Sequence, residues 1–244
     1  MIGRLLVWAG IALILTVPVA SRATDHVVTV EQLVEALGEA GEPETRWRAA
    51  EHLGRLGVGS ETVVSALVYS LDWDVDPAVR GHAAQALGLV GAGTAGTIES
   101  LIETLELDDS LMVRWRVVEA LERIGSATDE VSAVLVEVLR TDKFPGVRAR
   151  AAEAIGSVCP ATESVVPILT KALLRDSHPG VRWQAARALE ACAVRLQHAK
   201  ATGEISALRE ALIALSAQHQ PDILTNAAAV RRVIENLEQE LGRE

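Results

Sequence analysis

The sequence predicts an all-α solenoid of five tandem two-helix repeats, followed by a degenerate sixth that caps the C-terminal end. Three observations predict this fold. One segment recurs five times at a constant spacing of 34 residues, leucines recur at the same period just before each copy, and proline marks the start of most copies. A single helical hairpin cannot bury both of its faces, so the units are expected to stack on one another.

The second half of each repeat carries the clearest recurrence. Its copies read TRWRAAEHLGRLG, VRGHAAQALGLVG, VRWRVVEALERIG, VRARAAEAIGSVC and VRWQAARALEACA, starting at Thr45, Val79, Val113, Val147 and Val181. Proline precedes four of the copies, at Pro43, Pro77, Pro145 and Pro179. Proline fits the first turn of a helix, where its missing N–H has no partner to lose. Each copy is therefore predicted to be the second helix of its repeat.

The first half of each repeat is predicted to be a helix with one leucine face. Its first leucine column is Leu33, Leu67, Leu101, Leu135 and Leu169, and the second, four residues later, is Leu37, Leu71, Leu105, Leu139 and Leu173. Residues four apart lie on the same face of a helix. A column of hydroxyl residues precedes these helices, at Ser60, Thr94, Thr128 and Thr162. Such residues are good N-caps because their oxygen accepts a bond from a free amide.

Two charged columns predict a ladder along the stack. The acidic column is Asp74, Asp108, Asp142 and Asp176, and the basic column is Arg46, Arg80, Arg114, Arg148 and Arg182. A guanidinium can bind a carboxylate through two parallel hydrogen bonds. The alternative is that both columns are ordinary surface charge.

Tryptophan fills one column of the second helices in repeats one, three and five, at Trp47, Trp115 and Trp183, where repeats two and four have Gly81 and Ala149. At about 100° per residue this position faces away from the buried side of the helix. Tryptophan and arginine are enriched at binding hot spots. The candidate partner-binding residues are Trp47, Arg48, Glu51, Trp115, Arg116, Glu119, Trp183 and Arg187. Alternatively, each ring covers its smaller neighbour and only shields the groove.

The unit beginning at Asp176, DSHPGVRWQAARALEA, resembles the HEAT repeat in its short bacterial form, as in phycobilisome-lyase-like proteins. The resemblance covers about residues 29–198 and implies a right-handed solenoid whose second helices line the concave face. It departs from the family pattern at Ala40, Thr45 and Leu111. The family includes bilin lyases, a metal-dependent hydroxylase and many interaction modules. After Cys192 the period breaks, and residues 199–244 are expected to form the degenerate sixth repeat and cap.

The N-terminus has the features of an export signal. Arg4 precedes an uncharged run from Leu5 to Ala20, and Ser21-Arg22-Ala23 follows it. Sixteen helical residues span roughly 24 Å, less than the ~30 Å of a bilayer core. A cleaved signal peptide over residues 1–23 is therefore preferred to a membrane anchor over residues 5–20, which leaves residues 24–244 as the solenoid.

The net charge and the incomplete motifs argue against several classes of function. The formal net charge of −10 argues against nucleic acid as a partner. The GAGTAG at residues 91–96 has a helix cap as its expected role, and Asp72 to Asp76 lacks the glycine and glutamate of a calcium loop. The six histidines include no His-Glu-x-x-His. No cofactor, metal or catalytic residue is therefore expected. Cys159 and Cys192 are either two small core residues or, in an oxidising compartment, a disulfide.

The resulting hypothesis is a non-catalytic scaffold outside the cytoplasm that binds a protein or peptide on its concave face. The alternatives are a bilin-lyase-like chromophore chaperone or enzyme subunit, and a structural envelope protein.

Overall fold

The structure is a computed structural model. It describes residues 28–38, 41–125, 129–158, 165–198 and 205–217, and parts of 228–239. The expected export segment, the N-caps Thr128 and Thr162, and Cys159 lie outside these residues, and so does much of the expected cap.

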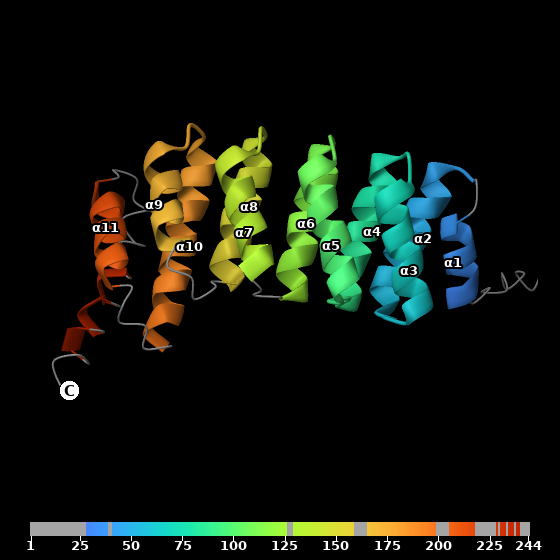
Figure 1. The fold of residues 1–244 in the computed structure, drawn as a ribbon, viewed down its shortest axis with the longest axis horizontal. Helices are drawn as coiled ribbons and strands as arrows, with labels where there is room; N and C mark the ends of the chain where they lie inside the picture. The colour runs from blue at the N-terminus through green and yellow to red at the C-terminus, as the bar shows by residue number, and fades with distance from the viewer. Residues whose placement is uncertain are drawn as a thin grey trace, which may run out of the picture.

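The described residues form a single row of stacked helical hairpins (Figure 1). The first helices of the repeats are α1 (Val30–Gly38), α3 (Glu61–Trp73), α5 (Ala95–Leu107), α7 (Asp129–Thr141), α9 (Val165–Arg175) and α11 (Ile205–Ser216). The second helices are α2 (Pro43–Leu56), α4 (Pro77–Val90), α6 (Leu111–Ile124), α8 (Pro145–Val158) and α10 (Pro179–His198). The predicted all-α solenoid is confirmed.

The helices form two layers with one continuous core between them. The second helices α2, α4, α6, α8 and α10 contact one another in order, as do the first helices from α1 to α11, and the first helices from α1 to α9 each pack on the second helix of their own repeat. The core is built from the leucine columns of the first layer and from alanine and leucine of the second, such as Leu67, Leu101, Ala83 and Leu87, all fully buried. Among the described residues, no helix combines the length and apolar character that crossing a membrane requires.

The helix ends follow the local sequence. Ser60 and Thr94 accept hydrogen bonds from the N–H of Val63 and Thr97 and so cap α3 and α5. Four second helices begin at the predicted prolines. The C-caps Gly57, Gly91 and Gly125 have φ of 66°, 66° and 67°, a left-handed conformation that glycine adopts without strain. The GAGTAG segment thus runs from the C-cap of α4 through a short loop into the first turn of α5.

The fifth repeat lacks such a stop. Ala193 occupies the position of the C-capping glycines, and α10 continues through it to His198. The helix has 20 residues, whereas α4 has 14. The break in the repeat pattern after Cys192 is therefore, in part, a longer helix.

Glycine also sets the distance between neighbouring second helices. A Cβ at Gly54, Gly88 or Gly156 would lie 2.9, 2.7 or 2.8 Å from the Cα of the alanine that it faces in the next repeat. The third repeat has Glu122 at this position, and α6 packs less extensively on α8 than on α4. A side chain at this point keeps two helices apart because their backbones otherwise approach to contact.

Candidate functional site

The arginine column of the second helices binds the aspartate column of the following repeat. Four pairs form, Arg46–Asp74, Arg80–Asp108, Arg114–Asp142 and Arg148–Asp176. In each, Nε lies 2.6–2.8 Å from Oδ2 and Nη2 lies 2.9–3.1 Å from Oδ1. This is the two-bond geometry that a guanidinium makes with a carboxylate.

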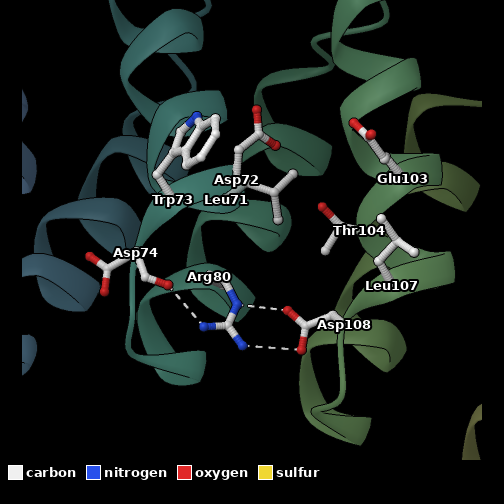
Figure 2. Close-up of a pocket in the computed structure, with 9 residues that line it drawn as sticks. All are labelled: Leu71, Asp72, Trp73, Asp74, Arg80, Glu103, Thr104, Leu107 and Asp108. Carbon is white, nitrogen blue, oxygen red and sulfur yellow. Dashed lines mark hydrogen bonds and ion pairs between the residues drawn. The ribbon is translucent and has the colours of Figure 1, made fainter.

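The remaining guanidinium nitrogen, Nη1, donates a hydrogen bond to a backbone carbonyl of its own repeat. Arg80 Nη1 donates to the carbonyl of Asp74 at 2.9 Å, and Arg114 Nη1 donates to that of Asp108 at 2.7 Å. Figure 2 shows Arg80 held in this way between Asp74 and the carboxylate of Asp108. Each aspartate also accepts the N–H two residues later, as Asp142 does from Phe144. The aspartates therefore lie in the loop between the two helices and connect two repeats.

The arginines at the two ends of the ladder, Arg46 and Arg182, differ from the others in their hydrogen-bond partners. Arg46 donates to the carbonyl of Gly41 in the first repeat, which has Ala40 in the aspartate column. Arg182 donates to the carbonyls of Asp176 and Ser177. Burial opposes ionisation of Asp74 and Asp176, but the hydrogen bonds from Arg46 and Arg148, the backbone N–H two residues later and the nearby positive charges together outweigh it and hold the pKa of each carboxyl below its usual value. These carboxylates are therefore ionised and paired with arginine, as in structural salt bridges.

The tryptophan column lies on the outward side of the second helices, where each ring is half-buried. Trp47 stacks on His82, with ring centroids 4.9 Å apart. The guanidinium carbons of Arg116 and Arg150 lie 5.3 and 5.5 Å from the ring centre of Trp115. We call this strip the second-helix surface, and define it by Trp47, His82, Trp115, Arg116, Arg150, Trp183 and Arg187.

Burial of the rings comes from the neighbouring repeat. His82 and Arg150 each stand 35 residues after the tryptophan that they contact. Gly81 is covered by Arg116, since a Cβ there would lie 3.7 Å from Arg116 Cγ. The contact that Trp47 makes with the next repeat is therefore its stacking on His82.

Acidic side chains complete the second-helix surface. Glu119 accepts hydrogen bonds from Arg116 and Arg123, at 3.3 and 3.1 Å. Glu51 pairs with Arg55, and Arg150 pairs with Glu122 and Glu153. Of the other candidate residues, Arg48 pairs with Glu44 and lies over Trp47, and Arg187 lies 4.8 Å from the ring centre of Trp183. Along the second-helix surface, aromatic rings thus alternate with ion-paired side chains.

His82 is the titratable group nearest to the first ring. Burial lowers the pKa of His82, the positive charge of Arg116 lowers it further, and Glu51 partly opposes the shift. Its Nδ1 is buried and has no hydrogen-bond partner in the described part of the chain. The imidazole is therefore neutral at pH 7 and acts as an apolar neighbour of Trp47.

A second group of exposed apolar residues, which no sequence pattern indicated, lies on the first helices. Tyr69 and Trp73 lie on α3 and Leu107 ends α5, all of them exposed. A hollow of about 410 Å³ lies between Trp73 and Leu107 (Figure 2). In the segment from Asp72 to Asp76, Asp74 belongs to the ladder, as its column predicts, and Asp76 caps α4. The described residues contain no cluster suited to a metal ion.

A family model of HEAT repeats matches residues 30–122, 64–156 and 132–231. The chain belongs to the HEAT-repeat family. The resemblance seen in the sequence is thereby confirmed. No curated protein matches this HEAT-repeat chain.

Several solved structures resemble this HEAT-repeat chain. An engineered protein is 25% identical, with a TM-score of 0.59 over 86% of this chain and 96% of its own. The complex of CpcE and CpcF of phycocyanin lyase from Nostoc sp. is 22% identical, with a TM-score of 0.56 over 86% and 94%. A designed armadillo repeat protein in complex with the peptide (KR)4 is 23% identical, with a TM-score of 0.53 over 84% and 99%. At these identities the likenesses support the fold.

Proposed function

We propose that this chain is a non-catalytic scaffold that binds a protein or peptide on its second-helix surface, outside the cytoplasm. One observation carries the proposal. Three tryptophans at every second repeat, Trp47, Trp115 and Trp183, stay partly exposed on one side of the stack, and each has an arginine against its ring. A partly exposed ring beside a guanidinium offers apolar area and charged hydrogen bonds at one point.

The spacing of the rings favours an extended partner. A solenoid presents its surface as a long strip, and an extended chain can contact successive repeats of it. The designed armadillo protein that resembles this fold has a structure in complex with the peptide (KR)4. The second-helix surface of this chain carries both arginine and glutamate, so we expect a partner of mixed charge rather than a purely basic one.

The charges of the strip favour recognition over catalysis. Glu51, Glu119 and Glu153 each pair with an arginine, and the pKa of His82 is lowered. A general acid or base needs a proton affinity matched to its task and access to a substrate. Side chains in such pairs serve instead to fix the rings and to orient a partner.

Export is proposed from the sequence, because the uncharged run from Leu5 to Ala20 and the small residues after it suit a signal peptidase. An exported scaffold would meet envelope or secreted proteins as partners.

The binding proposal is tested by selecting peptides from a displayed library on the full chain. Trp115→Ala should then weaken binding of the selected peptide by about tenfold or more, as expected of a hot spot. Arg116→Ala should mainly slow association. The control is Ile213→Ala, which removes a 71% exposed side chain from α11 and should leave affinity unchanged. A loss of several degrees in melting temperature with unchanged affinity for Trp115→Ala would mean that the tryptophan column is architecture.

A further inference from the structure

The first helices carry an apolar patch with an acidic rim. Its apolar members are Tyr69, Trp73, Val75 and Leu107, with 65%, 72%, 88% and 73% of their surface exposed. We call these four residues, with Asp72 and Glu103, the first-helix patch. Contiguous exposed apolar groups of this kind mark interaction sites more often than solvated surface.

The patch spans two repeats. Tyr69 and Trp73 are four residues apart and therefore share a face of α3. Leu107 occupies in α5 the position that Trp73 has in α3, 34 residues earlier. Trp73 borders the hollow of about 410 Å³ toward α5, and on the side of α1 a further hollow of about 310 Å³ that Tyr69 and Val75 also line. The indole of Trp73 thus separates two neighbouring hollows along the stack.

Two of the four carboxylates that line the hollow, Asp72 and Glu103, have no cation beside them among the described residues. Asp72 and Glu103 line it, and Figure 2 shows both beside Trp73 and Leu107. Within the described residues neither makes an ion pair, and Asp72 accepts one hydrogen bond, from Ser100 at 3.4 Å. The cation in the hollow is Arg80, whose guanidinium is already bound to Asp108 and to the carbonyl of Asp74.

The charge of Glu103 also acts on Asp72. Burial raises the pKa of Asp72, and the negative charge of Glu103 raises it further, against the hydrogen bond from Ser100. A positive group placed between them would offset this repulsion and favour the ionised form of Asp72.

We infer that the first-helix patch binds a lysine- or arginine-containing segment of a partner protein. A guanidinium or ammonium in the hollow would meet Asp72 and Glu103, and its aliphatic stem would lie on Trp73 and Leu107. An indole face attracts cations, and Trp73 is exposed enough to receive one. Charge complementarity selects this occupant, because the chain has a net charge of −10 and repels nucleic acid and its own copies.

The inference does not depend on the second-helix surface. Trp73 and Trp115 belong to different layers of the stack, α3 and α6. One surface can therefore fail its test while the other passes.

The test measures binding of a fluorescent octapeptide of alternating lysine and arginine to the full chain, by anisotropy at low salt. Trp73→Ala and Asp72→Asn should each raise Kd about tenfold, and Glu103→Gln should act in the same direction. Two matched controls remove the same kinds of group elsewhere. Glu210→Gln removes one exposed charge from α11, and Ile213→Ala removes a 71% exposed apolar side chain from the same helix. Both should change Kd by less than about twofold.

Because Trp73 is exposed, its removal should leave the melting temperature unchanged, so a change in Kd reports binding. An unaltered Kd for Trp73→Ala would overturn the inference. So would an equal loss for Glu210→Gln and Asp72→Asn, since net charge alone would then explain binding. If sedimentation shows that the wild type dimerises and Trp73→Ala does not, the occupant is a second copy of the chain and the inference is wrong.

Discussion

Arg114 on α6 binds the carboxylate of Asp142, 28 residues later, through Nε–Oδ2 at 2.7 Å and Nη2–Oδ1 at 3.1 Å. Both side chains are only 6% exposed. Arg114 also donates to the carbonyl of Asp108 and lies over the ring of Phe144. One guanidinium thus joins the loop of its own repeat to the loop of the next. A buried pair of this kind resists separation, because either partner left alone would be an uncompensated charge.

We predict that Arg114→Ala lowers the free energy of unfolding by roughly 2–4 kcal/mol, because Asp142 would keep its burial and lose its cation. The control is Arg140→Ala, which breaks an exposed pair with Glu137 and should cost about 0–1 kcal/mol. Urea unfolding followed by circular dichroism measures both. Equal losses for the two variants would show that the ladder is ordinary surface charge.

Gly88→Ala should destabilise the stack by roughly 1–3 kcal/mol, as overpacking does. The added Cβ would lie 2.7 Å from the Cα of Ala120, which is backbone and moves only with α6. Gly96→Ala is the matched control, since a Cβ there meets nothing within 4 Å in the first turn of α5. It should be neutral or stabilising by up to about 1 kcal/mol. Thermal melts of both variants check the prediction, and destabilisation by Gly96→Ala alone would contradict it.

Stability should fall as the pH drops below 6.5, in part because of His82. Its pKa in the folded chain is lowered from 6.5, so the unfolded chain takes up the proton first and protonation favours unfolding. His82→Gln should flatten the fall in melting temperature between pH 7 and pH 5. Proton NMR of the imidazole checks the cause directly. A titration midpoint above 6.5 for the resonance that disappears in His82→Gln would refute the prediction.

Residues 1–30, fused to a reporter enzyme that is active only outside the cytoplasm, should give activity, because Arg4 and the uncharged run after it suit an export signal. Replacing Leu13 and Leu15 by arginine should abolish the activity, since charges interrupt the apolar run. A silent fusion that is well expressed would contradict export. The mature N-terminus, sequenced from the exported chain, then distinguishes cleavage near Thr24 from a retained anchor.

Local chemistry made much of the fold predictable. Proline at Pro77, the hydroxyl of Ser60 and the missing side chain of Gly57 each act on their own helix end, so the sequence alone located these ends. The leucine columns likewise predicted the apolar face of the first helices, because residues four apart in a helix are always neighbours. The length of α10 was harder to predict, since a helix continues wherever no residue stops it.

The sequence by itself determined the repeat, its two helices and the residue types in each column, because these follow from a constant 34-residue period. Only the tertiary structure decided which columns meet. Arg114 binds Asp142 rather than the side chain of Asp108, and Trp47 stacks on His82. These partners belong to adjacent repeats, and their contact depends on how far one hairpin is displaced against the next. Backbone contact at Gly88 and Ala120 sets that displacement, and the same stacking leaves Trp73 exposed while it half-buries Trp115.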